Sequence, residues 1–302
     1  MMRSKGVLRL NLRGFLREWK SPAVMGIINV TPDSFYSWSR VTDSTVNSRA
    51  ESMVAAGATI LDIGGCSTRP GSEEPSEAEE LQRVLPAVES IREALPDIAI
   101  SIDTFRVEVA RQCLLAGADI INDISGGQRE PEMYNLVAEM KAPYILTHSR
   151  GTSKTMQSMT EYEDVVAEVL EFLAFGADKL HQAGVCDVIC DPGIGFAKTA
   201  AQNYALLGGI GLFAEVGPVL IGLSRKRMIT EVLGIDAEEA KNGTTALNMI
   251  SLMNGASILR VHDVREASET VKLYEAYRTS HPEPTHIITE KGRNGARHTT
   301  IY

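Results

Sequence analysis

The sequence has little cysteine and no long hydrophobic run. Only four cysteines occur among 302 residues, too few for the disulfide framework typical of small secreted domains. No apolar stretch reaches the length of a membrane span or of a secretory signal core. We therefore expect a reduced, soluble, cytoplasmic protein with no membrane partner.

Positive charge is also scarce. The chain has 30 Lys and Arg against 39 Asp and Glu, a formal net charge of −9. An acidic balance of this kind disfavours nucleic acid and anionic membranes as partners. It does not exclude a small anionic substrate, because a local cluster of basic side chains can outweigh the mean charge.

Two of the cysteines, Cys186 and Cys190, fall in the apolar run Val185–Cys190. We interpret this run as a strand, in which four residues span about 13 Å. That separation is too large for two ligands of one metal ion. Both cysteines are therefore predicted to be structural, acting as small hydrophobic side chains.

A repeated pattern organises the chain: a helical segment ends at a glycine, and a β-branched run follows. Gly57, Gly117, Gly184 and Gly255 occupy this place, roughly 60–70 residues apart. Glycine suits the left-handed conformation that ends many helices. Each interval has room for two strand–helix units of about 30–35 residues, so the pattern predicts eight units.

Eight apolar runs are the predicted strands. They are continuous rather than alternating, which is typical of strands buried on both faces. The runs are Ala23–Val30, Thr59–Ile63, Ile98–Ile102, Asp119–Ile124, Tyr144–Thr147, Val185–Cys190, Val219–Leu223 and Ser257–Val261. Between them, segments such as Glu77–Leu95 and Thr160–Gly184 carry apolar residues at helical spacing.

The fold class predicted from this pattern is α/β, with one eight-stranded parallel (β/α) barrel, a TIM barrel, over residues 23–278. That segment has the usual length of such a barrel, about 250 residues; an open doubly wound sheet is the alternative. Residues 1–22 contain an alternating run, Val7–Leu12, before a turn near Gly14. We expect them to form a hairpin that plugs the barrel bottom. Residues 279–302 show no periodicity and are predicted to be a mobile tail.

Polar residues follow every predicted strand. A single one of them is often only a helix cap, but eight in phase indicate a functional site, because active sites of such barrels lie at the carboxyl ends of the strands. In strand order they include Asn29, Asp62, Asp103, Asn122, His148, Asp191, Lys226 and Arg260.

These residues divide by charge. Arg69, Lys226, Arg260 and His262 form a predicted cationic cluster, for which phosphate or diphosphate is the natural ligand. Arg260 and His262 are two apart on a strand and should point the same way, and Ser224–Lys226 opens a helix, whose first N–H groups favour an anion.

The complementary set is Asp103, Asn122 and Asp191. A carboxylate here can accept paired N–H bonds from an aminopyrimidine-like ring. Gly193 and Gly195 allow close approach of a planar ligand, which Phe196 would line. The residues alone thus predict a barrel enzyme for a phosphorylated heterocycle, with Mg²⁺.

Several longer motifs, in order from about Leu8 to Arg278, resemble the dihydropteroate synthase family of pterin-binding enzymes. The fifth strand end, Ile145–Gly151, fits more loosely. The motifs are Met25–Phe35, Asp62–Gly65, Ser67–Gly71, Ser101–Thr104, Ile121–Ile124, Asp191–Thr199, Ser224–Lys226 and Arg260–Val264.

The resemblance implies condensation of 6-hydroxymethyl-7,8-dihydropterin diphosphate with p-aminobenzoate to 7,8-dihydropteroate and diphosphate. This is the step of folate synthesis that sulfonamides block in the family, and a homodimer is expected. Asn29 would bind Mg²⁺ on the diphosphate, and Arg260 with His262 would hold the leaving group. Metal and cations would stabilise its growing charge.

The resemblance also implies where the two substrates bind. Asp103, Asn122 and Asp191 would hydrogen-bond the pterin, and Lys226 its carbonyl or ring nitrogen. Asp103 would also favour the methylene cation left behind. Two loops would cover p-aminobenzoate, and they carry Phe35, Thr68, Arg69 and Pro70. The aromatic amine is neutral near pH 7, so no strong general base is needed, and no Ser–His–Asp constellation is evident.

Two departures from the family pattern matter. Where an acidic residue is usual in the first loop, this chain has Tyr36–Arg40, and either Ser37 or Asp43 is a candidate replacement. Arg227 replaces a usual serine and either meets the p-aminobenzoate carboxylate or is solvated. His148 is interpreted as structural or pocket-lining. The alternative functions are a pterin-binding methyltransferase barrel and a non-catalytic pterin-binding paralogue.

Overall fold

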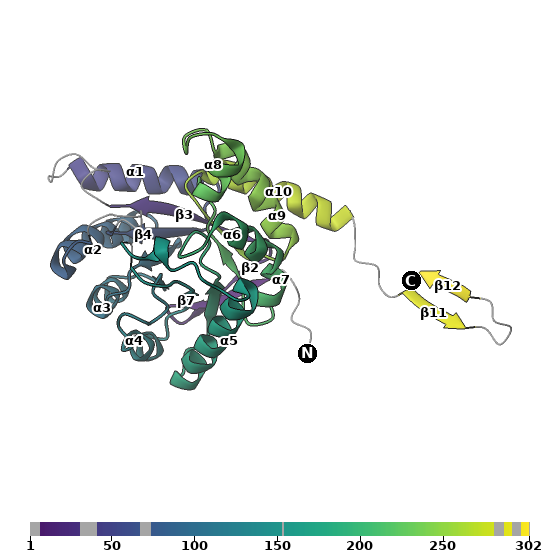
Figure 1. Ribbon diagram of the computed structural model, residues 1–302. Coiled ribbons are helices and arrows are strands. Elements are labelled where there is room, and N and C mark those ends of the chain that lie inside the picture. The colour runs from purple at the N-terminus through teal and green to yellow at the C-terminus, as the bar shows by residue number, and fades with distance from the viewer. Residues whose placement is uncertain are drawn as a thin grey trace.

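Eight parallel strands form a nearly closed barrel with helices around it (Figure 1). The computed structural model describes residues 7–30, 41–66, 74–152, 154–280, 287–291 and 297–301. The barrel strands are β3 (Ala23–Asn29), β4 (Ile60–Gly64), β5 (Ala99–Asp103), β6 (Ile120–Asp123), β7 (Tyr144–Thr147), β8 (Val188–Asp191), β9 (Leu220–Ile221) and β10 (Ile258–Val261).

The strands pair in the order β8-β7-β6-β5-β4-β3-β10-β9. A parallel bridge between Cys190 and Val219 joins the two ends of this order, and the Cys190 N–H donates to the Pro218 carbonyl at 2.8 Å. The strands therefore close on themselves, which confirms the predicted barrel over the open sheet.

Helices alternate with the strands, as predicted. They are α1 (Val41–Ala55), α2 (Glu77–Ala94), α3 (Val107–Leu115), α4 (Met133–Met140), α5 (Val165–Ala183), α6 (Ala200–Gly208), α7 (Ile210–Phe213), α8 (Arg227–Leu233), α9 (Lys241–Met253) and α10 (Val264–Ser280), with a 3₁₀ turn at Met156–Ser158. None of the described helices is long and apolar enough to cross a membrane.

Local capping decides where two of the predicted helices begin. Helix α2 starts after Ser76, which forms a reciprocal capping box with Glu79. Helix α5 starts five residues later than the predicted Thr160, because the Asp164 carboxylate accepts from the N–H groups of Val166 and Ala167.

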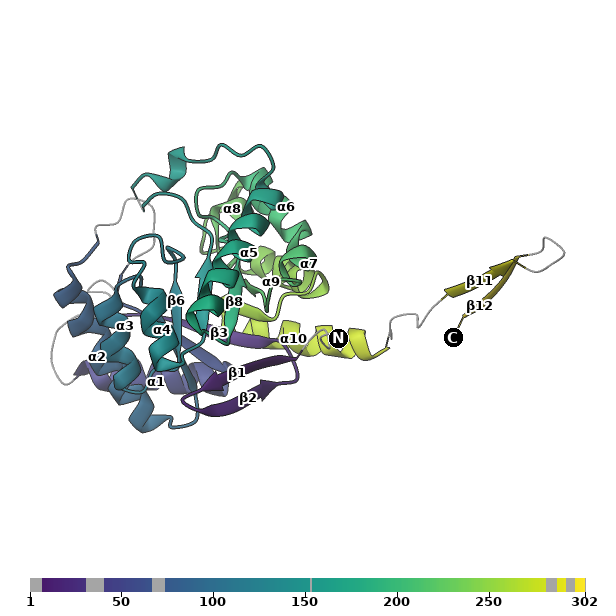
Figure 2. The same ribbon diagram turned by 90° about the horizontal axis from the view of Figure 1, so that it is seen from below.

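The predicted hairpin is present as β1 (Leu8–Leu12) and β2 (Phe15–Trp19), paired antiparallel (Figure 2). Its buried side chains pack against the first inward-facing residues of the barrel strands, and together they form an apolar cluster at the barrel bottom. The cluster consists of Leu8, Leu10, Leu12, Trp19, Ala23, Met25, Ile60, Ala99, Ile120, Ile145, Ile189, Leu220 and Ile258. The hairpin thus plugs the barrel bottom, as the sequence predicts.

Two sequence predictions differ from the structure. Cys186 is exposed and precedes β8, so only Cys190 is a buried strand residue. The C-terminal segment contains a second antiparallel hairpin, β11 (Ile287–Lys291) with β12 (Arg297–Ile301), where no regular structure was predicted. Isoleucine and threonine in these strands favour β structure, although the segment shows no apolar periodicity.

Candidate active site

The barrel interior changes from apolar to polar along the strands. Because side chains alternate between the two faces of a strand, the residue two positions after each strand residue of the apolar cluster at the barrel bottom points inward again. In this way Ile60 is followed by Asp62, Ile120 by Asn122, Ile145 by Thr147, Ile189 by Asp191 and Ile258 by Arg260. The apolar cluster at the barrel bottom excludes water, and the polar groups lie in the next layer, toward the carboxyl ends of the strands.

Arg260 lies at the centre of this polar layer. Its guanidinium donates to Asp62 and to Asp103, at 2.6 Å in each case, and both carboxylates are buried. Burial raises the pKa of Asp103 to about 7, and the neighbouring guanidinium opposes that rise. The two carboxylates in return raise the pKa of Arg260, so this arginine stays charged.

Asn122 completes the group. Its amide nitrogen donates to Asp62 at 3.1 Å, whereas its own carbonyl oxygen, one Asp62 oxygen and the Thr147 hydroxyl have no partner among the described residues. A buried polar atom without a partner costs free energy. These atoms are therefore available to a polar ligand in the barrel mouth.

Asp191 and Lys226 form the other side of the mouth. Burial raises the pKa of Asp191, and the Lys226 ammonium group counteracts it most strongly. Burial lowers the pKa of Lys226 to about 8, with Asp191 opposing. The Lys226 ammonium donates to the Ile194 carbonyl and lies 4.9 Å from the centroid of the Phe196 ring.

A tight turn after β8 positions Asp191. The Gly193 N–H donates to the Asp191 carboxylate at 2.8 Å, and Gly193 has a φ of 68°. A Cβ at this position would overlap the carbonyl oxygen of His148, so only glycine fits. Among the described residues, only the Gly193 N–H donates to this carboxylate.

Lys198 holds this turn in place from behind. Its buried ammonium contacts the carbonyl oxygens of Gly193 at 3.0 Å and Phe196 at 2.9 Å, and the Nδ1 atom of His148 at 3.0 Å. Burial lowers the pKa of Lys198 to about 7. Burial and the Lys198 charge lower the pKa of His148 to about 3. His148 is therefore a neutral structural acceptor, one of the two roles that the sequence left open.

His148→Asn is expected to reduce the dependence of the free energy of unfolding on pH in the acid range. The folded-state pKa of His148 is lowered to about 3. Between about pH 6.5 and pH 3 the unfolded state therefore binds one more proton than the folded state, and stability decreases as the pH is lowered. Asparagine offers an amide oxygen in place of Nδ1 but does not titrate. The slope of unfolding free energy against pH should decrease by up to about 1.4 kcal/mol per pH unit.

Urea unfolding between pH 3 and pH 7 measures this slope. Loss of the ring contacts of His148 with Phe172 shifts the whole curve and leaves its slope unaffected. His181→Asn, which removes an exposed imidazole from the last turn of α5, is the matched control. An unchanged slope in His148→Asn would contradict the neutral role of His148.

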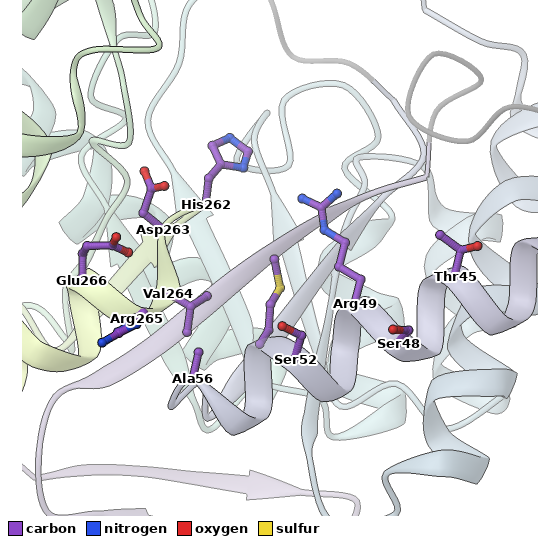
Figure 3. A pocket seen from close by; sticks show the side chains of 11 residues that line it. Thr45, Ser48, Arg49, Ser52, Ala56, His262, Asp263, Val264, Arg265 and Glu266 are labelled. Atoms are coloured by element: carbon purple, nitrogen blue, oxygen red, sulfur yellow. The ribbon is translucent and has the colours of Figure 1, made fainter.

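The remaining predicted residues lie at different depths. Asn29 is half-buried at the end of β3. His262 lies just beyond β10, is exposed, and lines a groove outside the barrel between α1 and α10 (Figure 3). Arg227 is 75% exposed and pairs with Glu231 on α8, which is the solvated alternative. Helix α8 is only seven residues long, so it adds little dipole to an anion site.

Some predictions lie outside the described residues. These are the two loops over p-aminobenzoate, with Phe35, Thr68, Arg69 and Pro70, and the replacement region Tyr36–Arg40.

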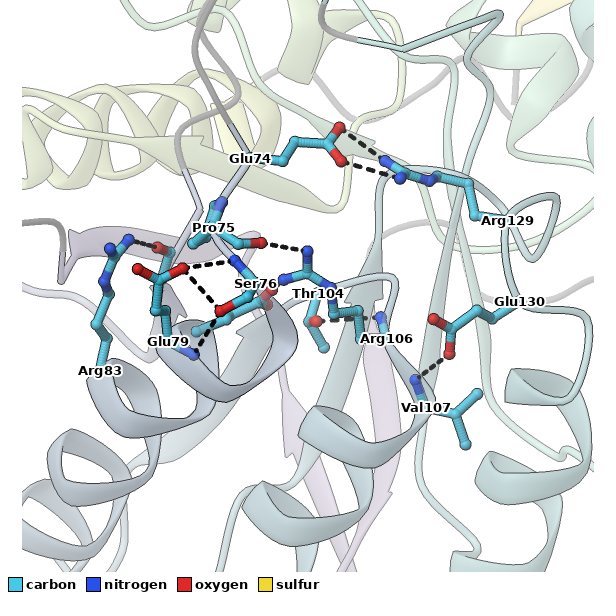
Figure 4. A network of polar contacts seen from close by, with 12 residues as sticks. Glu74, Pro75, Ser76, Glu79, Arg83, Thr104, Arg106, Val107, Arg129 and Glu130 are labelled. Atoms are coloured by element: carbon cyan, nitrogen blue, oxygen red, sulfur yellow. Dashed lines mark hydrogen bonds and ion pairs between the residues drawn. The ribbon is translucent and has the colours of Figure 1, made fainter.

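The chain returns from the second of these loops onto a network of arginines (Figure 4). Arg106 pairs with buried Glu80 and donates to the Pro75 carbonyl. Arg129 binds the Glu74 carboxylate with two nitrogens, at 2.7 and 2.9 Å. The network anchors residues 74–76 beside the mouth.

Two residues of the site were missed as candidates in the sequence. Asp62 appeared only as a strand-end polar residue, although it binds both Arg260 and Asn122. Lys198 lies in the motif Asp191–Thr199, yet nothing in the sequence indicates that it is buried. The one available signal for Lys198 was the presence of a charged residue inside this glycine-rich motif.

Comparison with known proteins shows which family the chain resembles. A profile of the family described as pterin binding enzyme matches residues 25–262. A dihydropteroate synthase of Synechocystis is 46% identical over 267 residues, which cover 86% of this chain and 92% of the relative. That of Escherichia coli K12 is 42% identical over 274 residues, which cover 89% and 96%.

Solved structures give the same result. Dihydropteroate synthase of Yersinia pestis in a sulfonamide drug complex has a TM-score of 0.83 and 38% identity, and the match covers 90% of this chain and 100% of that one. The enzyme of Xanthomonas albilineans in complex with 7,8-dihydropteroate has a TM-score of 0.80 and 35% identity, covering 90% and 99%.

Fold and site together are those of an α/β-barrel enzyme, with buried carboxylates and cations at the carboxyl ends of its strands. With the sequence matches, the assignment becomes specific. The chain belongs to the pterin-binding enzyme family and, within it, to the dihydropteroate synthases.

Proposed function

We propose that this chain condenses 6-hydroxymethyl-7,8-dihydropterin diphosphate with p-aminobenzoate, forming 7,8-dihydropteroate and diphosphate. The observation that carries the proposal is the barrel mouth, where Asp103, Asn122 and Asp191 lie among Lys226 and Arg260. Hydrogen-bond acceptors for a pterin and cations for its diphosphate thus occur in one buried layer.

The acceptor set suits the pterin. Ring N–H and amino groups can donate to the Asp191 carboxylate and to the Asn122 carbonyl oxygen, which has no partner among the described residues. Lys226 can donate to the pterin carbonyl or a ring nitrogen from beside Phe196. Asp103, held by Arg260, places negative charge where the methylene carbon becomes positive as the diphosphate leaves.

The leaving group is stabilised by cations. Arg260 supplies a fixed positive charge, and His262 supplies an N–H donor at the strand end. We propose that Asn29 holds Mg²⁺ through its amide oxygen. A single oxygen ligand fits a cation that takes most of its coordination from phosphates and water, and Mg²⁺ would neutralise charge on the departing diphosphate.

Release of diphosphate tests the proposed reaction. The purified protein is mixed with pterin diphosphate, p-aminobenzoate and Mg²⁺, and diphosphate and dihydropteroate are quantified. We expect equal amounts of both, dependent on p-aminobenzoate and lowered by EDTA and by a sulfonamide. Neither a pterin-binding methyltransferase nor a non-catalytic paralogue would release diphosphate, so no release above background would contradict the proposal.

We further propose that the protein is a cytoplasmic homodimer. Cys113, Cys186 and Cys190 form no disulfide among the described residues, as expected in a reducing compartment. Exposed apolar side chains are frequent on neighbouring helices α7 to α10, and such a surface favours association. They are Leu212, Val232, Leu233, Ile250, Met253, Leu273 and Tyr277. Light scattering measures the molecular mass in solution, and the mass of a monomer would contradict the proposed homodimer.

A further inference from the structure

A large groove lies outside the barrel, next to the mouth (Figure 3). It has a volume of about 770 Å³ and runs between helix α1 and the start of helix α10. Thr45, Ser48 and Arg49 line the α1 wall, and His262 and Asp263 line the other. The Arg49 and His262 side chains extend toward the same open side of the groove.

Helices α1 and α10 both pack on β3, and this packing forms the base of the groove. Gly26 of β3 lies beneath them, where a Cβ would stand 3.0 Å from the Met53 sulfur and 3.1 Å from Val264. A Cβ at Gly57 would overlap Ser268 of α10. The two glycines let α1 and α10 approach each other, so the position of Arg49 relative to His262 is set by the fold.

The carboxylates near the groove already have cationic partners. Asp263 accepts from Arg225 at 3.0 and 2.9 Å, and Glu266 pairs with Lys241 at 2.9 Å. The groove's second arginine, Arg265, pairs with Glu269 at 3.1 Å. For Arg49, in contrast, no ion pair occurs within the described ranges. Among the described residues of the groove, its positive charge therefore has no carboxylate partner.

Arg49 and Arg260 act on the same histidine. Although the His262 side chain reaches solvent, desolvation by the surrounding protein, then the charge of Arg260 and that of Arg49, lowers its pKa to about 4. His262 is thus a neutral N–H donor that is influenced by two guanidinium groups, that of Arg260 in the barrel and that of Arg49 on α1. The N-terminus of the 17-residue helix α10 adds partial positive charge at this end.

We propose that Arg49 binds the terminal phosphate of the departing diphosphate. Arg260 would then contact the phosphate nearer the pterin, His262 would lie between them, and the groove would be the exit route of the product. A diphosphate carries charge on both phosphates, and a guanidinium matches phosphate geometry with two N–H groups. The inference relies on the proposed function for the identity of the anion.

Calorimetric titration with inorganic diphosphate and Mg²⁺ tests the role of Arg49. For Arg49→Ala we expect about tenfold weaker binding, the loss of one charge-assisted contact at a half-exposed position. In steady-state kinetics the KM for pterin diphosphate should rise by a similar factor, with the KM for p-aminobenzoate unchanged. Arg49→Lys should retain part of the affinity.

Arg265→Ala is the matched control. It removes an arginine from the same groove, but one whose side chain points away from Arg49 (Figure 3) and already pairs with Glu269. Equal losses in both variants, or no loss in Arg49→Ala, would overturn the inference. If the wild type binds diphosphate but forms no dihydropteroate, the proposed reaction fails, while the titrations still decide the role of Arg49.

Discussion

Replacing Arg260 with alanine is expected to lower the free energy of unfolding by about 3–5 kcal/mol, the usual cost of removing one partner from a buried ion pair. The Arg260 guanidinium binds Asp62 and Asp103, at 2.6 Å each. Both carboxyl groups are buried, so the variant leaves two buried acidic groups without their cationic hydrogen-bond partner. Urea unfolding followed by circular dichroism measures the change.

Two further variants separate this effect from a general loss of positive charge. Arg227→Ala removes the exposed pair with Glu231 and is expected to cost less than about 0.5 kcal/mol. Adding Asp62→Asn to Arg260→Ala removes one uncompensated charge and should restore part of the lost stability. An Arg260→Ala variant with the unfolding free energy of the wild type would argue against the counterion role of Arg260. A double variant less stable than Arg260→Ala alone would do the same.

Asp191→Asn is expected to weaken pterin binding by at least about 100-fold. The substitution neutralises a buried acceptor and turns an N–H₂ group toward the donors of the ligand. Hydrogen bonds to a charged group contribute about 1.5–3 kcal/mol each, and a pair of them corresponds to two or more powers of ten in affinity. Fluorescence titration with a 7,8-dihydropterin measures the dissociation constant.

Asp187→Asn is the matched control for this variant. Asp187 immediately precedes β8 and accepts the Asn11 N–H at 2.7 Å near the hairpin, so the same chemical change occurs at the opposite end of the barrel. An amide oxygen can still accept that bond, and pterin affinity should remain unchanged. Comparable affinity in wild type and Asp191→Asn would remove Asp191 from the pterin site.

Much of the fold could be predicted because it depends on local patterns. The eight apolar runs became strands β3 to β10, and the alternation of Leu8, Leu10 and Leu12 became one side of the plug. The beginning of α5 could not be read from periodicity, because the Asp164 cap, rather than the apolar pattern, sets its first turn. The hairpin β11–β12 was not predicted because its strands lack apolar periodicity.

The sequence also predicted which residues belong to the mouth, but not how they pair. Asp103, Asn122, Asp191, Lys226 and Arg260 were all expected at the carboxyl ends of strands. The structure adds that Arg260 is the counterion of two carboxylates. It also adds the clamp that Lys198 makes on the turn after β8. Such contacts join residues far apart in the chain, which periodicity does not relate.

The sequence by itself determined the order of strands and helices, the plug, and the end of the barrel where polar groups lie. These features follow from side-chain alternation, helical periodicity and short motifs, all of which act over a few residues. Only the tertiary structure decided which polar groups meet. Asp62 and Arg260 are 198 residues apart, and barrel closure brings β10 beside β3. The groove with Arg49 depends likewise on how α1 and α10 pack on β3.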